Sequence, residues 1–181
     1  MKRIALTLIG KDRPGIIAKA SEILYKAGCN IEDTTMTLLG GQFAMILVGT
    51  LQTSEENKLK RDFQRWTSRG ELHCFWKVLP QTLVRGEKHP AGTQTYIVSV
   101  MGKDRTGLVY ETSRLLGRMD LNITDLNSKI LGSGDKTVFA MVLEVDVPKK
   151  FNLSQLEVAL KKLTKRLGVD IRLKPLERLS L

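Results

Sequence analysis

The chain has 181 residues, of which 42% are hydrophobic and 27% charged, and its net charge at neutral pH is +10. This composition excludes a wholly disordered, collagenous or coiled-coil chain, and no apolar run approaches the roughly 20 residues of a membrane-spanning helix. The two cysteines, Cys29 and Cys74, provide neither a disulfide framework nor a four-ligand zinc site. Because the N-terminus also lacks the pattern of a secretory signal, we expect a cytoplasmic protein.

The first elements predicted along the chain are a strand, a loop and a helix. Apolar residues alternate over residues 4–8, as they do in a strand. The loop Gly10–Gly15 then leads into a helix that Gly28 is suited to end. The buried stripe expected on this helix is Ile17, Ala20, Leu24 and Ala27.

Two strands and a second helix follow. The strands are predicted at 30–39 and 42–51, on either side of a Gly-Gly turn. Thr53 and Glu56 have the spacing of a capping box at the start of a helix. The apolar stripe of that helix is Leu59, Phe63 and Trp66. A strand at 71–79 completes the first half.

The second half repeats the motifs of the first. The loop Gly10–Gly15 reads Gly-Lys-Asp-Arg-Pro-Gly, and Gly102–Gly107 reads Gly-Lys-Asp-Arg-Thr-Gly, an offset of 92. At the same offset, Asn30-Ile31 recurs as Asn122-Ile123. A period of this length is too long for a solenoid repeat and indicates a duplicated domain.

The same order of elements is predicted for the second half. The stripe of its first helix is Leu108, Thr112, Leu115 and Met119. A hairpin turn at Gly132–Asp135 precedes a strand at 138–145. Ser154 and Glu157 are predicted to cap the second helix, before a final strand at 169–174. The buried residues expected on that helix are Leu156, Leu160, Leu163 and Leu167, with Gly168 at its end.

The order β-α-β-β-α-β, occurring twice, predicts an α+β protein of two ferredoxin-like domains. Each would be an antiparallel sheet with two helices on one face. We place the domains at residues 1–80 and 95–181, joined by a linker at 81–94 that is broken by proline and glycine. Strand 42–51 is apolar on both sides, which is typical of a buried strand. We therefore expect the helix-free face or the sheet edge to pack on the other half, or on a second copy in a homodimer.

The loop Gly10–Gly15 and its repeat are candidate anion sites. Glycine lets a backbone approach a ligand closely, and the N–H groups at a helix start attract a carboxylate or phosphate. The alternative is a helix-entry turn in which Asp12 and Asp104 cap the helices. Asn30 and Asn122 could hold an amino acid through an amide that both donates and accepts, or they could be turn residues.

The run Gly10–Ile16 and the later Cys29-Asn30-Ile31 resemble the ACT domain, a small regulatory module that binds amino acids. The tandem arrangement is similar to the glycine cleavage system transcriptional repressor family. This resemblance implies a non-enzymatic protein that binds an amino acid effector such as glycine. It also implies a protein partner such as a transcription factor, without direct nucleic-acid binding. ACT domains place the effector between two modules, against the loop after the first strand and the start of the second. The ligand-binding residues implied are Asp12, Arg13, Pro14, Gly15, Asn30, Ile31, Asp104, Arg105, Thr106, Gly107, Asn122 and Ile123.

The residues give little support for catalysis. Neither His73 nor His89 recurs in the repeat, and Cys29 lies near a helix C-terminus, where the dipole would raise the pKa of its thiol. We predict no catalytic residue, no metal site, no cofactor and no membrane partner. Residues 149–181 contain nine basic and three acidic residues. The alternative hypothesis is therefore a nucleic-acid-associated protein that uses this basic C-terminal face.

Overall fold

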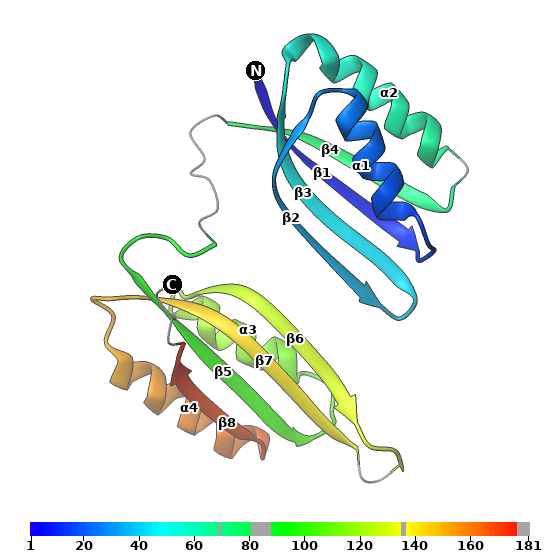
Figure 1. The fold of residues 1–181 in the computed structure, drawn as a ribbon. Coiled ribbons are helices and arrows are strands. Elements are labelled where there is room, and N and C mark those ends of the chain that lie inside the picture. The colour runs from blue at the N-terminus through cyan, green and yellow to red at the C-terminus, as the bar shows by residue number, and fades with distance from the viewer. Residues whose placement is uncertain (69, 81–87, 135–136, 177–181) are drawn as a thin grey trace. The chain divides into compact units, whose positions relative to one another are not determined.

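The computed structural model describes residues 1–68, 70–80, 88–134 and 137–176, and the chain forms two compact units, Met1–Gly86 and Glu87–Leu181 (Figure 1). The first unit contains β1 (Lys2–Lys11), α1 (Ile16–Lys26), β2 (Asn30–Leu39), β3 (Gln42–Leu51), the 3₁₀ helix η1 (Thr53–Glu55), α2 (Glu56–Thr67) and β4 (Leu72–Leu79). The second unit contains β5 (Thr93–Lys103), α3 (Leu108–Arg118), β6 (Asn122–Leu131), β7 (Val138–Pro148), α4 (Leu153–Leu167) and β8 (Asp170–Pro175). Of the linker predicted at 81–94, residues 81–87 lie outside the described part of the chain, and Thr93 and Gln94 belong to β5.

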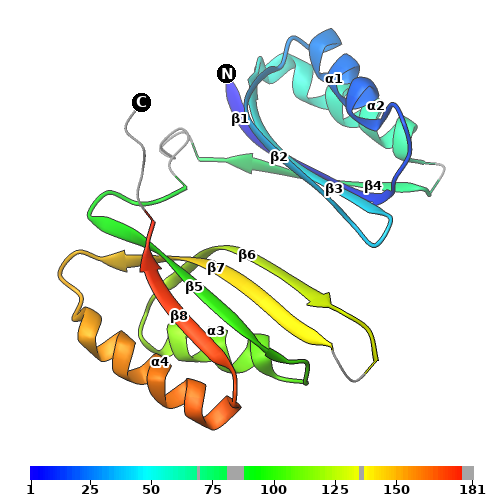
Figure 2. The same cartoon turned by 60° about the horizontal axis from the view of Figure 1, so that its bottom comes forward.

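Each unit has two layers, a sheet and a pair of helices. The strand order is β2-β3-β1-β4 in the first sheet and β6-β7-β5-β8 in the second, and neighbouring strands are antiparallel. The two helices of each unit cover one face of its sheet, as two views of the ribbon show (Figure 1 and Figure 2). The predicted fold class, a ferredoxin-like α+β domain occurring twice, is therefore confirmed.

The core of the first unit lies between its sheet and its helices. The sheet contributes alternate residues of β1 and β3, namely Ile4, Leu6, Leu8, Phe43, Met45 and Leu47. Helix α1 contributes Ile16, Ala20, Ile23 and Leu24, and Ala27 follows at its C-cap. The prediction of Ile17 in this stripe is wrong, because its side chain is 49% exposed. Helix α1 begins at Ile16, and adjacent helical residues point about 100° apart, so only one of the two isoleucines can face the sheet.

The start of the second helix differs from the predicted capping box. Thr53 lies in η1, and no side chain caps either η1 or α2. Glu56 is instead buried and forms ion pairs with Lys2 of β1 and Lys60 one turn further along α2. The predicted box is therefore wrong: the Glu56 carboxylate pairs with Lys2, which the fold brings from β1, and with Lys60 of its own helix, and no side chain caps the helix.

The buried face predicted for helix α4 is confirmed, but its predicted N-terminal cap is not. Its buried residues are Leu156, Leu160, Leu163 and Leu167, and Gly168 follows in the left-handed conformation with φ 63°. Asn152 holds the N-cap position and no side chain caps the helix, so the predicted cap of Ser154 and Glu157 is wrong. On α3 the fully buried residues are Leu108, Thr112 and Leu116, while the predicted Leu115 and Met119 are partly buried against the same core. Asp135 of the predicted turn lies outside the described residues.

The helix-free face of the first sheet carries exposed apolar side chains. Ile9 is 41%, Ile46 is 50% and Phe75 is 61% exposed within this unit. The strand register places Ile46, Thr7 and Phe75 side by side across β3, β1 and β4. Strand β3 is thus apolar on both sides, as the sequence indicated. That this face packs on another module or a second copy stays a prediction.

The ends of α1 and α3 give a stability prediction. Gly28 ends α1 with φ 61°, whereas Asp120 occupies the matching position after α3 with φ 56°. A left-handed conformation costs an L-residue about 1–2 kcal/mol, and glycine's extra freedom in the unfolded chain offsets part of that. We expect Asp120→Gly to raise the free energy of unfolding of the second unit by about 0.5 kcal/mol, measured by urea denaturation. The matched change Gly28→Ala should lower that of the first unit. A loss of stability in Asp120→Gly would show that the aspartate side chain outweighs the backbone strain.

Candidate functional site

The loop between β1 and α1 is held by backbone contacts on both sides. The amide of Asp12 donates to the carbonyl of Gly41 at 3.1 Å, and the amide of Lys11 donates to the carbonyl of Glu71 at 3.2 Å. A Cβ atom at Gly10 would come within 2.1 Å of the same Glu71 oxygen. Gly10 therefore permits a close approach between β1 and the chain entering β4.

The helices that follow the two loops begin without a side-chain cap. Gly15 holds the N-cap position of α1 with φ 89°, and Gly107 holds that of α3 with φ 97°. The alternative role of Asp12 and Asp104 as caps is therefore wrong. Helix α1 also has no acidic residue in its first turn. The first amides of α1 thus lack a side-chain acceptor and are suited to an external carboxylate or phosphate.

The predicted ligand residues fall into two groups at opposite ends of each sheet. The first group lies in the loops after β1 and β5 and consists of Asp12, Arg13, Pro14, Gly15, Asp104, Arg105, Thr106 and Gly107. The second group lies at the starts of β2 and β6 and consists of Asn30, Ile31, Asn122 and Ile123. Gly10 pairs with Phe43, whereas Asn30 pairs with Thr50, which pairs with Arg3. The seven steps along β1 from Arg3 to Gly10 correspond to about 23 Å at about 3.3 Å per residue. One ligand cannot contact both groups within a single unit.

A cavity of about 310 Å³ lies beside the first loop. Its lining residues are Arg13, Arg65, Trp66, Glu71 and Leu72. The Nε atom of Arg13 lies 3.5 Å from Oε2 of Glu71, and both side chains are about half exposed. Of these residues, sequence reasoning singled out Arg13 alone for binding. It placed Trp66 in the core, where the indole indeed packs in part. No sequence pattern indicated Glu71, because it meets Arg13 only through the pairing of β1 with β4.

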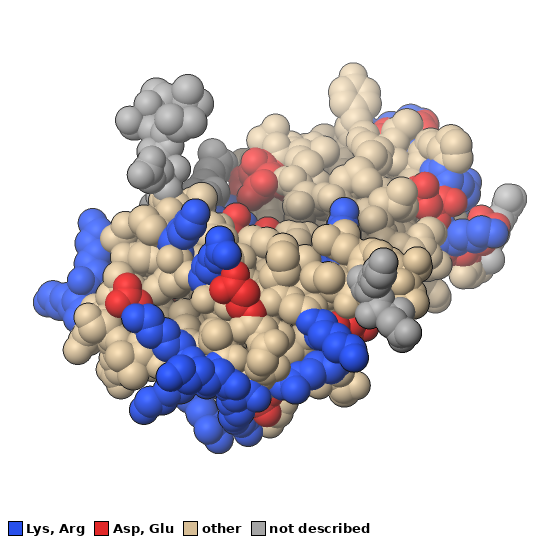
Figure 3. Space-filling model, turned by 90° about the horizontal axis from the view of Figure 1, so that it is seen from below, with Lys and Arg blue, Asp and Glu red and all other residues tan. Residues whose placement is uncertain are grey.

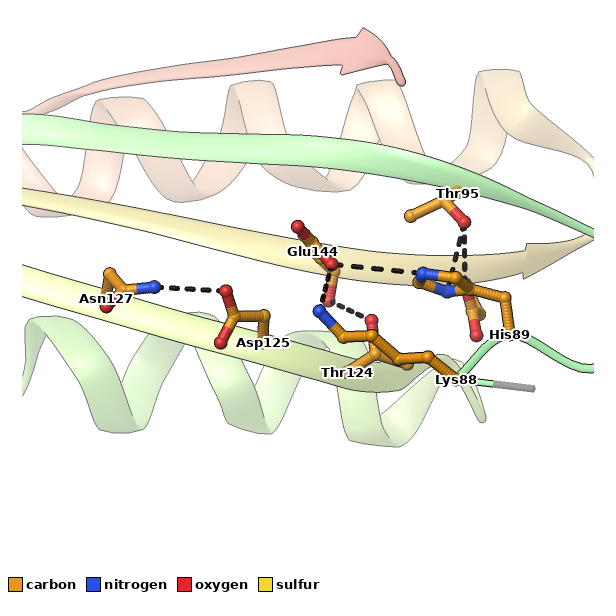
Figure 4. Close-up of polar contacts among 8 residues, drawn as sticks. Lys88, His89, Thr95, Thr124, Asp125, Asn127 and Glu144 are labelled. Carbon is orange, nitrogen blue, oxygen red and sulfur yellow. Dashed lines mark hydrogen bonds and ion pairs between the residues drawn. The ribbon is translucent and has the colours of Figure 1, made fainter. Parts of the chain in front are cut away.

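A polar cluster lies on the helix-free face of the second sheet (Figure 4). The Nδ1 atom of His89 is 2.7 Å from Oδ1 of Asp146, and the Thr95 hydroxyl donates to the same oxygen at 3.0 Å. An ionised carboxylate only accepts hydrogen bonds, so Nδ1–H of His89 is the donor to Asp146. Lys88 forms an ion pair with Glu144, the neighbouring acidic residue of β7. These contacts attach the segment before β5 to strand β7. Sequence reasoning missed them because it left His89 in the linker.

The chemistry of this cluster is that of a structural contact. Asp146 and Thr95 are each 3% exposed. His89 Nδ1 also lies 3.2 Å from the Thr95 hydroxyl, but this nitrogen carries the proton that it donates to Asp146 and therefore cannot accept the hydroxyl proton. Among the described residues, no three His, Cys, Asp or Glu side chains are grouped so that they could hold a metal ion. Within the same residues, no helix is long and apolar enough to cross a membrane.

Basic side chains gather over part of the surface seen in Figure 3. The last two turns of α4 contribute the exposed residues Lys161, Lys162, Lys165 and Arg166. Arg166 forms an ion pair with Glu111 of α3 at 2.6 Å, whereas the three lysines have no ion pair among the described residues. Cations at this end of a helix are favoured by the macrodipole. Arg178, part of the predicted basic block, lies outside the described residues.

Burial keeps both thiols protonated. It raises the pKa of Cys74 to about 11, and burial together with the nearby Glu32 raises the pKa of Cys29. We expect neither native cysteine to react quickly with a disulfide reagent at pH 7.5, because the thiolate is the reactive form. Both should react at once in denaturant, which serves as the control. Rapid labelling of the native protein would contradict this burial.

Comparison with known proteins places this architecture in a family. Residues 2–77 and 94–174 both match the family model of the ACT domain. A UPF0237 protein of Methanopyrus kandleri is 39% identical over 67 residues, which cover 36% of this chain and 74% of the relative. The glycine cleavage system transcriptional repressor of Escherichia coli is 38% identical over 45 residues, which cover 25% of this chain and 24% of the repressor.

Two solved structures share the fold over nearly the whole chain. A protein of unknown function from Galdieria sulphuraria is 24% identical with a TM-score of 0.81, covering 97% of this chain and 99% of that one. A structure provisionally described as a glycine cleavage system transcriptional repressor is 21% identical with a TM-score of 0.71, covering 98% of each chain. At these identities the likeness is evidence for the fold alone. With both of its units matched by the family model, the chain belongs to the ACT domain family.

Proposed function

We propose that this protein is a non-enzymatic regulator that binds a small amino acid through its ACT domains and thereby controls a protein partner. The observation that carries the proposal is the loop between β1 and α1. Its backbone is anchored on both sides, Gly15 opens a helix without a side-chain cap, and the Arg13 guanidinium lies beside it. A rigid loop with free helix amides and a cation is suited to an amino acid carboxylate.

Two modules together hold the effector in this proposal. Since the loop and the start of β2 are about 23 Å apart in one unit, a ligand that contacts both must join the loop end of one module to the strand-start end of another. The second module is the other half of the chain or a second copy in a homodimer. A ligand of this kind favours the paired arrangement, because only that arrangement contacts both ends of it. The bound form then presents a different surface to the partner.

The similarity to the glycine cleavage repressor of Escherichia coli supports glycine as the effector and a transcription factor as the partner. That similarity extends over a quarter of each chain. The effector is therefore sought among all twenty amino acids, with glycine as the first candidate.

The test is a thermal-shift screen of the purified protein against the twenty amino acids at millimolar concentration, followed by calorimetry. A ligand at one hundred times its Kd adds about 2.7 kcal/mol to the free energy of unfolding, which a melting curve resolves. We expect one amino acid to stabilise the wild type, and Asp12→Ala or Asn30→Ala to lose that effect. Asn57→Ala, an exposed asparagine on α2, is the control and should keep it. If none of the twenty amino acids shifts the melting temperature, the proposal fails.

The basic surface of α4 favours a second candidate, a protein that associates with nucleic acid. Three exposed lysines on one helix, which form no ion pair with any residue that the structure describes, are suited to phosphate contacts. The affinity of such binding falls steeply as the salt concentration rises. Each phosphate contact contributes about −0.9 to the slope of log K against log salt concentration. A double-stranded DNA titration at 50 and 200 mM salt, with the triple change of Lys161, Lys162 and Lys165 to glutamine, separates this candidate from the first. Binding that survives the triple change would exclude this surface.

A further inference from the structure

We propose that the helix-free face of the first sheet is the interface of a homodimer, in which the same face of a second copy packs against it. The side chains of this face point away from α1 and α2, which cover the opposite side of the sheet (Figure 2). The inference goes beyond the proposed function, because this contact needs no effector.

The centre of the helix-free face is apolar and reaches water. Phe75 of β4 is 61% exposed and Ile46 of β3 is 50% exposed, although both lie in the middle of their strands. Removal of such side chains from water drives most protein association. Strands about 4.8 Å apart and about 30 Å long give the four-stranded face an area of roughly 600 Å². Two copies would bury roughly 1,200 Å², which is the lower end of the range for specific interfaces.

The strand register makes this face complementary to itself in shape. A two-fold axis parallel to the strands places β1 of one copy over β3 of the other, and β4 over β2, as in the aligned packing of two sheets. Residues that are neighbours across the inner strands of one copy then face each other between the copies. Each such pair joins a larger side chain to a smaller one: Ile46 with Thr7, Ile9 with Ala44, and Val48 with Ala5. Side chains of unequal size on facing positions interdigitate, as close packing requires.

Phe75 fits the same arrangement. It pairs with Thr7 within the sheet, and Thr35 pairs with Ile46, so these four side chains form one row across the face. The axis along the strands brings Phe75 of each copy over Thr35 of the other, whose short side chain leaves room for the ring. A buried aromatic residue at the centre of an interface commonly carries much of the binding energy.

The charges at the two edges of the sheet fix the direction of the axis. Lys77 pairs with Ala5 and Asp33 pairs with Val48, so one row has a lysine at one edge and an aspartate at the other. Both are exposed, and neither forms an ion pair with a residue that the structure describes. The axis along the strands places Lys77 of each copy over Asp33 of the other. An axis across the strands would place Lys77 over His73 and leave Asp33 without a cation.

The second unit does not offer an equivalent apolar face. In its strand register, Arg172 takes the place of Phe75. Glu144, which is paired with Lys88, takes the place of Val48. Charged residues are depleted at the centres of interfaces because their desolvation is costly. We therefore assign the homodimer contact to the first unit.

Sedimentation velocity of the full chain, without added amino acid and over a hundredfold range of protein concentration, tests the interface. We expect a monomer–dimer equilibrium with a Kd in the micromolar range, as suits an interface of this small size. Phe75→Asp should raise the Kd at least a hundredfold. Tyr25→Asp, which changes an exposed aromatic residue on α1, is the control and should leave the Kd within twofold. Melting curves check that each variant is folded.

Exchange of the edge charges tests the arrangement of the two copies. Lys77→Asp and Asp33→Lys each place like charges opposite one another, and each should raise the Kd at least tenfold. The double variant should return to within threefold of the wild type. An equimolar mixture of the two single variants should also dimerise, because each copy supplies the charge that the other lacks. Lys174→Asp changes the matching lysine of the second unit and should have no effect.

Four results would overturn the inference. The first is a wild type that stays monomeric at every concentration. If Phe75→Asp then also lowers the melting temperature, another part of the same chain covers the face. The second is a dimer that survives Phe75→Asp, since it forms through a different surface. The third is a mixture of the single charge variants that stays monomeric, and the fourth is a dimer that Lys174→Asp dissociates.

The homodimer and the proposed amino acid sensor fail independently. The axis along the strands keeps the loops between β1 and α1 of both copies at the same end of the dimer. This contact is therefore separate from the arrangement that joins the loop end of one module to the strand-start end of another. Loss of the dimer in Phe75→Asp should leave the thermal shift by the effector in place, and absence of any effector leaves the dimer unchanged.

Discussion

Gly10→Ala is expected to lower the free energy of unfolding of the first unit by about 3 kcal/mol or more. The new methyl group would lie 2.1 Å from the carbonyl oxygen of Glu71 and 2.9 Å from the Cα atom of Leu72. Both are backbone atoms, so relief requires β4 to separate from β1 next to the loop. Urea denaturation followed by circular dichroism measures the loss, and hydrogen exchange locates it in the first unit.

Gly102→Ala is the matched control in the second unit. There the methyl group would meet the side chain of Val169, with its Cγ1 atom 2.6 Å away. A side chain can move more easily than a strand backbone, so the loss should be smaller. Adding Val169→Ala should recover part of it. Equal losses in the two units, or a loss below about 1 kcal/mol in Gly10→Ala, would contradict the close packing of β1 on the chain entering β4.

His89→Ala is expected to lower the free energy of unfolding of the second unit by about 3 kcal/mol. The Asp146 side chain is almost fully buried, and its Oδ2 atom has no hydrogen-bond partner in the described part of the chain. Removing the imidazole leaves the carboxylate with the Thr95 hydroxyl as its remaining described donor. An uncompensated buried charge of this kind is among the most destabilising changes that a protein undergoes.

The other histidine is the control for this prediction. His73 is exposed on β4, and His73→Ala should change the free energy of unfolding by less than about 0.5 kcal/mol. The double variant His89→Ala with Asp146→Ala removes the buried charge as well. It should be more stable than His89→Ala alone, and the cycle gives the coupling between the two side chains. A double variant less stable than the single one would show that water replaces the imidazole.

The two units share one fold but differ in the side chains beside the repeated loop. Identical Gly-Lys-Asp-Arg runs begin in the last two residues of β1 and β5 and continue into the loops, but the chain that packs beside them differs. Glu71 and Trp66 give the first unit a charged cavity with an apolar wall. In the second unit, Gly168 stands at the Glu71 position, and the polar contacts of His89 lie on the other face of the sheet.

Several features of the fold could be predicted from the sequence because they depend on near neighbours. The apolar alternation of residues 4–8 predicted β1, and the leucines of α4 predicted its buried face. The recurrence of Gly10–Gly15 as Gly102–Gly107 predicted the duplicated domain. The wrong predictions about single positions arise where two arrangements satisfy the same apolar pattern. Either Ile16 or Ile17, for example, could have faced the sheet. At Glu56 a cation from β1 replaced the expected backbone contact.

The sequence by itself determined the order of elements, the two-fold repeat and the family, since periodicity and turn residues act over a few positions along the chain. Only the tertiary structure decided which distant residues meet. The register of β1 with β4 brought Glu71 to Arg13, and the pairing of β5 with β7 brought Thr95 to Asp146. The pairing of β3 with both β1 and β2 placed Asn30 far from the loop with which it was grouped. Strand pairing depends on the packing of the whole sheet, so a motif in the chain names candidate residues but not their neighbours.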